Sequence, residues 1–163
     1  MNGTAVDTNI LSEIFLGGPR AASAVRSLKD ALAVGPVLAS GIVYTELCGV
    51  GPGEAVVGLL SDMGIELDAQ LSLEVWDIAA AAWRTYLGRR RATGSSYHCP
   101  ACGQANETFL CVGCGTRIGG PRHILADFLI GAHASVAASC LLTWDRGIYR
   151  TYFTALRVIH PSV

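Results

Sequence analysis

Met1-Asn-Gly-Thr4-Ala-Val6-Asp7-Thr8-Asn9-Ile-Leu11 opens the chain and organises the rest of the predicted fold. Residues 4–6 are typical of a short buried strand, and Asp7 stands where that strand ends. Thr8 and Asn9 then begin a helix. Ligands of open α/β sheets bind beyond the carboxyl ends of the strands, so Asp7 is a candidate metal ligand. Asp is also a frequent helix N-cap, and this stretch alone leaves both roles open.

The composition indicates a folded domain with an ample core. The chain has 163 residues, 51% of them hydrophobic and 15% charged, which suits one domain with a small appendage and excludes a disordered chain. The longest apolar run, 78–83, is far shorter than the ~20 residues of a membrane span, and no signal peptide is visible. The net charge of -1 argues against general coating of nucleic acid. We therefore expect a cytoplasmic protein.

Segments with strand and helix patterns alternate along the chain. This order predicts an α/β fold of three layers, in which helices flank a central, mostly parallel sheet. Trp76 and Trp83, seven residues apart in the longest predicted helix, are expected to pack in the core. The predicted strands are 4–6, 37–39, 65–67, 140–143 and 156–159, and the main predicted helices are 21–32, 54–63, 72–87, 122–136 and 148–153.

Four acidic residues do not fit a solvent-exposed role. Asp7 and Asp145 each follow a buried strand, which places both at one edge of a parallel sheet. Glu46 and Asp127 lie inside otherwise apolar helical segments. At separations near 5 Å, each pair of carboxylates repels by roughly 3 kcal/mol. Either some of them are protonated or a divalent cation lies between them, and their hard oxygen ligands favour Mg²⁺ or Mn²⁺.

The same acids lie in four segments that resemble the four motifs of the PIN-domain nucleases. The resemblance is closest to the VapC-type toxins of bacterial type II toxin–antitoxin systems, and it covers the chain except residues 97–119. The segments are Val6-Asp7-Thr8-Asn9-Ile-Leu-Ser12, Tyr44-Thr-Glu46-Leu47, Ala126-Asp127-Phe-Leu-Ile-Gly-Ala-His-Ala134 and Leu142-Thr143-Trp-Asp145-Arg-Gly-Ile-Tyr149.

The resemblance implies an endoribonuclease that uses Mg²⁺ or Mn²⁺, is held inactive by an antitoxin protein, and forms a homodimer. It assigns the metal to Asp7, Glu46, Asp127 and Asp145, while Asn9 and Thr143 orient ligands or the attacking water. Two other functions stay open: a PIN nuclease of RNA maturation or quality control, and a non-catalytic RNA-binding scaffold. A haloacid-dehalogenase phosphatase is disfavoured, because it needs an Asp at the position of Asn9.

Residues 97–119 interrupt the α/β pattern and carry two Cys-x-x-Cys pairs. Thiolates at this spacing complete a tetrahedral site for structural Zn²⁺ with the four residues Cys99, Cys102, Cys111 and Cys114. A redox-active Cys-x-x-Cys more often occurs singly and opens a helix. We therefore expect a zinc ribbon at 97–119, inserted into a PIN domain formed by 1–96 and 120–163.

Arginines are concentrated around this insert. We interpret the ribbon as a substrate-recognition arm that contacts RNA phosphates, although a protein-interaction surface is the alternative. Positive charge at 89–91 would also complement the dipole at the C-terminal end of the preceding helix. The candidate RNA-binding residues are Arg89, Arg90, Arg91, Arg117, Arg122 and Arg146.

Overall fold

The structure is a computed structural model of the whole chain. It describes residues 3–93, 97–98, 105–106, 109–110, 113–115, 117–118 and 125–162, and their side chains at 3–89, 113–115 and 125–162.

A five-stranded sheet forms the centre of the molecule, in the order β3-β2-β1-β8-β9. Every neighbouring pair in it is parallel, so all five strands end at the same edge. The central strand pairs on both sides, with Thr4 opposite both Val37 and Cys140. Residues that follow β1 and β8 therefore meet at the middle of the carboxyl edge. The strands are β1 (Thr4–Val6), β2 (Val37–Ser40), β3 (Ile65–Asp68), β8 (Cys140–Leu142) and β9 (Arg157–Ile159).

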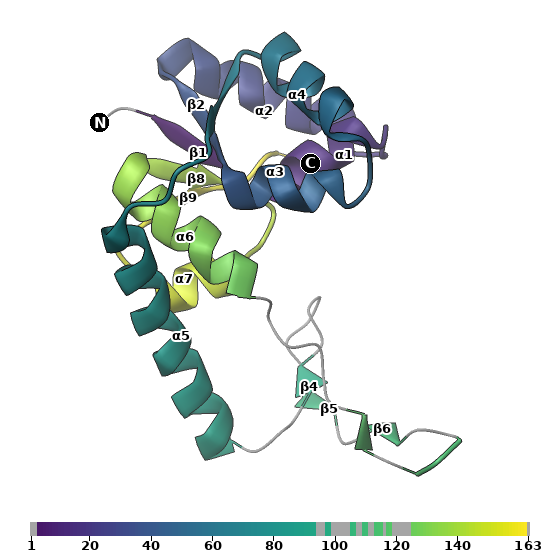
Figure 1. Cartoon of the computed structure of the whole chain (residues 1–163), viewed down its shortest axis with the longest axis vertical. Coiled ribbons are helices and arrows are strands. Elements are labelled where there is room, and N and C mark those ends of the chain that lie inside the picture. Colours follow the sequence, from purple (N-terminus) through teal and green to yellow (C-terminus); the bar gives the residue numbers. More distant parts are fainter. Residues whose placement is uncertain are drawn as a thin grey trace.

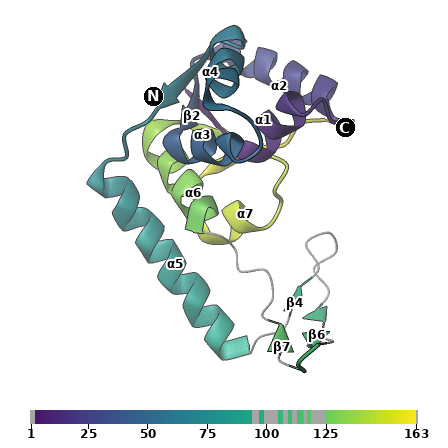
Figure 2. The ribbon, with the colours of Figure 1, turned by 45° about the vertical axis from the view of Figure 1, so that its right-hand side comes forward.

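Helices cover both faces of the sheet, which confirms the predicted three-layer α/β architecture. Parallel crossover connections are right-handed, so the connections β1–β2–β3 place their helices on one face, and the connections β3–β8–β9 place theirs on the other. Figures 1 and 2 show these two groups on opposite sides of the strands. The first group is α1 (Thr8–Phe15), α2 (Ala21–Val34), α3 (Gly41–Cys48) and α4 (Gly53–Asp62); the second is α5 (Leu73–Thr93), α6 (Leu125–Ala137) and α7 (Ile148–Tyr152).

The core is densest around α6, which packs against both the sheet and α5. Seven consecutive residues of this helix, 128–134, are buried. The Phe128 ring lies 5.2 Å from that of Trp83 and 5.4 Å from that of Tyr152. A Cβ at Gly131 would come within 2.5 Å of the Phe153 ring, so only glycine allows this close approach. This packing holds the first turn of α6, which contains Asp127, beside the carboxyl edge of the sheet.

The longest helix differs from its predicted form in two ways. Helix α5 continues to Thr93, so residues 89–91 lie within its last turns and do not follow it. The expectation that Trp76 packs in the core is wrong, because its side chain is 48% exposed. The buried stripe of α5 contains Val75 and Ala79, and position 76 is rotated about 100° away from it. Trp83 is half-buried and packs on the aromatic core as expected.

The segment between α5 and α6 forms two short antiparallel pairs that are separate from the main sheet. They are β4 (Tyr97–His98) with β5 (Ala105–Asn106), and β6 (Phe109–Leu110) with β7 (Arg117–Ile118). Each pair encloses one Cys-x-x-Cys sequence. Cys114 is exposed, whereas the predicted ligands Cys99, Cys102 and Cys111 lie outside the described residues. In the described part of the chain, no helix is both long enough and apolar enough to cross a membrane.

Candidate active site

The acidic site begins at Asp7, directly after the central strand. The Asp7 backbone N–H donates to the carbonyl of Leu142 at 3.0 Å, which extends the pairing of β1 with β8 by one residue. This contact holds Asp7 against the end of β8, and the residue is only 4% exposed. Asp7 occupies the N-cap position of α1, but its side chain makes no capping hydrogen bond. The capping role is therefore wrong, and the carboxylate points elsewhere.

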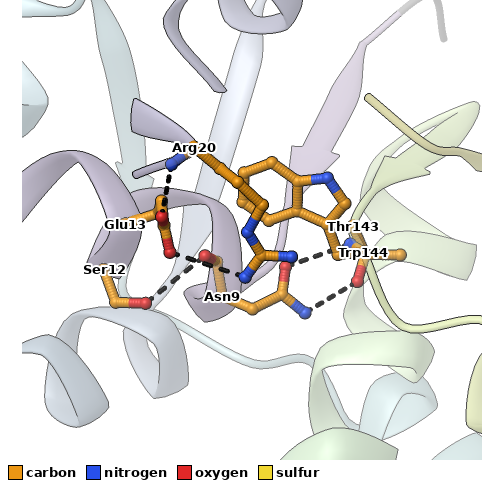
Figure 3. Close-up of polar contacts among 6 residues, drawn as sticks. All are labelled: Asn9, Ser12, Glu13, Arg20, Thr143 and Trp144. Carbon is orange, nitrogen blue, oxygen red and sulfur yellow. Dashed lines mark hydrogen bonds and ion pairs between the residues drawn. The ribbon is translucent and has the colours of Figure 1, made fainter. Parts of the chain in front are cut away.

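Asn9 and Thr143 hold the carboxylate of Asp7. Its Oδ2 accepts hydrogen bonds from Asn9 Nδ2 at 2.7 Å and from Thr143 Oγ1 at 2.6 Å. Asn9 Nδ2 also donates to Thr143 Oγ1 at 2.9 Å, and Asn9 Oδ1 accepts from the Trp144 backbone N–H at 3.1 Å. Figure 3 shows the Asn9 amide reaching both Thr143 and Trp144 across the gap between α1 and the end of β8. Together these hydrogen bonds fix the orientation of the Asp7 carboxylate.

Asp145 is fixed by the loop that precedes α7. Its backbone N–H donates to Thr143 Oγ1 at 2.9 Å. Its Oδ1 accepts from the backbone N–H groups of Gly147 and Ile148, both at 2.8 Å, so this oxygen caps the start of α7. Asp145 Oδ2 makes no hydrogen bond to a described residue. One oxygen of this carboxylate is thus structural, and the other is available for chemistry.

The pKa of Asp7 reflects this environment. Burial raises the pKa of its carboxyl from the ordinary value of 3.8 to about 6, and the negative charge of nearby Asp145 adds to the increase. The Thr143 hydroxyl, the Tyr149 phenol and the backbone N–H of Thr8 lower the pKa of Asp7, because each lies near enough to favour the ionised carboxylate, but they do not cancel the increase. A positive charge beside Asp7 would relieve the cost of its ionised form.

Tyr149 lies among three of the predicted acids. Burial raises the pKa of its phenol well above 10, and the negative charges of Asp7, Asp127 and Asp145 raise it further. Its side chain is 1% exposed. Tyr149 lies close enough to Asp7 to lower the pKa of that carboxyl. The Tyr149 hydroxyl nevertheless makes no hydrogen bond to any described residue, although it is buried. Asp127 is half-buried in the first turn of α6, where the helix dipole favours a carboxylate.

Glu46 borders the site from α3. Thr8 Oγ1 donates a short hydrogen bond to Glu46 Oε2, which joins the residue after Asp7 to the third helix. Glu46 also lines a hollow of about 490 Å³ on the surface, which we call the Glu46 hollow. Its other lining residues are Gly41, Ile42, Thr45, Ala69, Leu71, Trp76 and Ala126. Because Ala126 precedes Asp127, the hollow extends from Glu46 toward the acidic residue of α6.

The arginines predicted to bind RNA are only partly described. The Arg89 guanidinium lies 5.2 Å from the centre of the Tyr152 ring, so it packs on α7. Arg146 is exposed beside Asp145. The backbone of Arg117 lies in β7, but its side chain, those of Arg90 and Arg91, and the whole of Arg122 lie outside the described residues.

A cation that the sequence did not suggest lies next to the acidic site. The Arg20 guanidinium lies 4.2 Å from the centre of the Trp144 ring. In the sequence, Trp144 stands between Thr143 and Asp145. Glu13 holds Arg20 from the other side through the Arg20 backbone N–H at 2.7 Å and Nη2 at 3.5 Å (Figure 3). Arg20 is exposed and lies outside every motif, so no sequence pattern pointed to it.

The donor set suits a divalent cation, although it is not gathered into one group. Among the residues that the structure describes, no three His, Cys, Asp or Glu side chains lie together as a group that could hold a metal ion. Asp7 and Asp145 nevertheless interact electrostatically, and both act with Asp127 on the Tyr149 hydroxyl. Carboxylate oxygens fit Mg²⁺ or Mn²⁺ better than a softer metal.

Two further residues of the site had no role assigned from the sequence. Thr8 and Tyr149 both lie within the quoted motifs, but nothing in their spacing shows that one reaches Glu46 and the other lies among the acids. A buried aromatic residue in a short amphipathic helix is ordinarily part of the core. Only the position of α7 at the carboxyl edge shows that the Tyr149 hydroxyl lies near the acids.

The comparisons with known proteins support the fold. No family model and no curated protein matches the sequence. Among solved structures, the chain is similar to a chain in the crystal structure of VapBC2 from Rickettsia felis bound to a DNA fragment from their promoter. The sequences are 18% identical, the TM-score is 0.58, and the alignment covers 98% of both chains. This likeness extends over the full length and shows that the chain has the PIN-like α/β fold expected from its sequence.

Proposed function

We propose that this protein is a Mg²⁺- or Mn²⁺-dependent endoribonuclease and the toxin of a toxin–antitoxin pair. The observation that carries the proposal is the network at the ends of β1 and β8, where Asn9 and Thr143 fix a buried Asp7 beside Asp145. If Asp7 served only the fold, nothing would require its carboxyl to be ionised, because burial makes the ionised form costly. A carboxylate held in one orientation beside another is what metal-assisted hydrolysis requires.

The residues of this chain have distinct tasks in the proposed reaction. Asp7, Asp127, Asp145 and Glu46 would hold the metal. When bound, the metal supplies an activated water and offsets charge on the phosphodiester. Thr143 and Asn9 keep Asp7 oriented, and the N–H groups of Gly147 and Ile148 keep Asp145 oriented. Burial of Asp7 excludes water from one side of the site, which strengthens its interaction with a cation.

The Glu46 hollow offers a place for RNA next to the acids. Its walls are mostly apolar, and Trp76 presents an exposed indole there. Bases of single-stranded RNA stack on such aromatic faces without strong sequence preference. We place Arg20 and Arg146, beside Trp144 and Asp145, as contacts to the RNA backbone, together with the predicted Arg89, Arg90, Arg91, Arg117 and Arg122.

The proposed partners follow from the fold. The similar R. felis chain is part of a VapBC2 complex, which favours a cognate antitoxin protein as the partner of this chain. We extend the proposal to a homodimer in the cytoplasm. The two Cys-x-x-Cys sequences, each enclosed by a short antiparallel pair, favour a second function in RNA maturation or quality control, with the ribbon as the RNA-recognising arm.

Replacing Asp7 by Asn tests the nuclease. Purified protein is incubated with total RNA and with labelled oligoribonucleotides, with Mg²⁺, Mn²⁺ or no divalent metal, and cleavage sites are mapped. We expect metal-dependent cleavage that Asp7→Asn abolishes and that Asp30→Asn, a change of the same type on the exposed face of α2, leaves unaltered. Equal cleavage by wild type and Asp7→Asn would refute the assignment and favour a non-catalytic RNA-binding protein.

Metal analysis tests the zinc ribbon separately. We expect one Zn²⁺ per chain in wild type and none in Cys111→Ser, since four thiolates are needed to close the site. Deleting residues 97–119 should weaken RNA binding and lower the dependence of its affinity on salt, because fewer phosphates would be neutralised. An unchanged salt slope would instead favour the ribbon as a protein-interaction surface.

A further inference from the structure

Three buried polar side-chain atoms have no hydrogen-bond partner in the described part of the chain. They are Trp144 Nε1, the Tyr149 hydroxyl and His160 Nε2. Trp144 and Tyr149 follow β8, and His160 follows β9 and contacts the carbonyl of Thr143 through its Nδ1. Native proteins satisfy the great majority of such atoms, so a concentration of exceptions at one place calls for a physical account. Tyr149 is the one whose hydroxyl lies among the acids.

The surroundings of Tyr149 combine a rigid ring with an unused donor. The ring packs against Phe153, 6.3 Å away between centroids, and α7 holds it from a start that Asp145 caps. Asp7, Asp127 and Asp145 are each near enough to raise the pKa of the phenol. Since carboxylates only accept hydrogen bonds, the phenol is the natural donor among them. Packing alone does not require the oxygen, because phenylalanine would fill the same space.

We propose that Tyr149 is a positioning residue of the acidic site, whose hydroxyl donates to Asp7 when a divalent cation is bound and thereby orients that carboxylate toward the metal. Asp7 Oδ2 already accepts from Asn9 and Thr143. A further donor, from α7, would restrict the remaining rotation of the carboxylate. This inference rests on the proposed metal-dependent function and concerns how that metal is held.

The chemistry of the phenol explains why a tyrosine suits this position. A lysine or arginine among three carboxylates would neutralise part of their charge and compete with the divalent cation for them. A phenol supplies a hydrogen bond and adds no charge, so the site keeps its attraction for the metal. Hydrogen-bonded neighbours of metal ligands typically change metal affinity by roughly 10- to 100-fold when they are removed.

Binding of Mn²⁺ to Tyr149→Phe tests the inference. The full-length protein, purified without added divalent metal, is titrated with Mn²⁺ by calorimetry at pH 7.5, and thermal melts are recorded with and without Mn²⁺. Asp7→Asn defines the binding that belongs to the acidic site. Tyr152→Phe, three residues on in the same helix, is the matched control.

We expect Tyr149→Phe to bind Mn²⁺ roughly 10- to 100-fold more weakly. Its melting temperature without metal should stay the same or rise, because a buried unpartnered hydroxyl is removed. High Mn²⁺ concentrations should restore kcat, since the reacting groups are intact. Tyr152→Phe should keep the wild-type Mn²⁺ affinity.

Three outcomes would overturn the inference, and each is distinguishable. If wild type binds Mn²⁺ more tightly than Asp7→Asn while Tyr149→Phe matches wild type, the hydroxyl has no positioning role and the nuclease proposal survives. If Tyr149→Phe does not fold without metal, as judged by circular dichroism, the oxygen serves the fold. If wild type binds no more Mn²⁺ than Asp7→Asn, both this inference and the proposed function fail.

Discussion

The carboxyl edge of the sheet has two unlike halves. Beyond β1 and β8, the carboxylate of Asp7 accepts hydrogen bonds from Asn9 and Thr143, and that of Asp145 accepts two from the backbone. Beyond β2 and β3, the edge opens into the Glu46 hollow. There, Thr8 binds Glu46, and His133 Nε2 lies 3.1 Å from Asp68 Oδ2.

This contrast separates two requirements of a nuclease. Groups that act on the reacting atoms must be held within a narrow range of positions, and buried hydrogen bonds achieve this before the substrate arrives. Groups that bind a flexible strand gain from open, apolar surface that fits many bases. The β1–β8 half meets the first requirement and the β2–β3 half the second. Apart from Glu46, which is proposed to hold the metal, substitutions in the two halves should therefore affect different kinetic constants.

After the loss of cleavage in Asp7→Asn, the largest effect is expected for Asp145→Asn. Asparagine keeps an Oδ1 that accepts from the N–H groups of Gly147 and Ile148, so the start of α7 is preserved. It removes the negative charge that a cation would meet. Loss of about 4 kcal/mol of transition-state stabilisation lowers kcat by about 10³-fold. Single-turnover cleavage with Mn²⁺ measures the loss, and melts confirm the fold. Cleavage within a few-fold of wild type would contradict the role given to this half.

The next effect is a pH dependence of stability caused by Asp7. Below pH 3.8 its carboxyl is protonated in both folded and unfolded chains. Between pH 3.8 and about 6 the unfolded chain releases the proton and the folded chain retains it, so the free energy of unfolding falls as pH rises. Above about pH 6 the cost is constant, at about 3 kcal/mol.

Comparing wild type with Asp7→Asn isolates this contribution. Without divalent metal, the free energy of unfolding of wild type should fall relative to Asp7→Asn as pH rises from 4 to about 6.5, and then run parallel to it. Urea melts at half-unit steps measure the difference, with Asp30→Asn as the control for loss of one carboxylate. A difference that does not change with pH would mean that Asp7 is not constrained as its burial implies.

Thr143→Val is expected to have the third-largest effect, on both stability and kcat. The change keeps the shape of a fully buried side chain and removes the oxygen that donates to Asp7 and accepts from Asn9 and the Asp145 N–H. Leaving these partners unsatisfied costs about 2 kcal/mol of stability, and kcat should fall by roughly 10-fold or more because Asp7 loses an orienting bond. Thr85→Val removes an exposed hydroxyl from α5 and should change neither quantity. Equal losses in both variants would point to a general effect of the substitution.

The sequence predicted one half of the edge much better than the other. Asp7 and Asp145 could be placed together because each follows a buried strand, and parallel strands end at one edge. Asn9 and Thr143, which the resemblance implies orient ligands or the attacking water, both donate to Asp7, and their part in a reaction stays a prediction. These residues lie near strand ends, where chain position nearly determines position in space.

Contacts between the side chains of different helices and loops could not be predicted. Arg20 contacts Trp144 from the loop before α2, and Thr8 at the start of α1 hydrogen-bonds Glu46 in α3. Both contacts depend on how helices pack, which no local pattern encodes. Trp76 was expected in the core because it is hydrophobic. Hydrophobicity alone does not tell which face of a helix is covered by the rest of the protein. The Glu46 hollow exists because that face of α5 remains open.

The smallest effect is expected for Trp76→Ala, in the open half. If a base stacks on this indole, its loss costs at the lower end of the roughly 1–3 kcal/mol that such contacts contribute. The KM for a single-stranded oligoribonucleotide should then rise about tenfold with kcat unchanged, because Trp76 holds none of the reacting groups. Trp76→Phe should retain most of the affinity. Leu73 is also exposed and apolar and lies one turn earlier, but it does not line the hollow, so Leu73→Ala should leave KM unaltered.

A fall in kcat at constant KM would show that the two halves share one task and would remove the contrast between them. A normal KM combined with lost binding of the cognate antitoxin would assign the hollow to the protein partner.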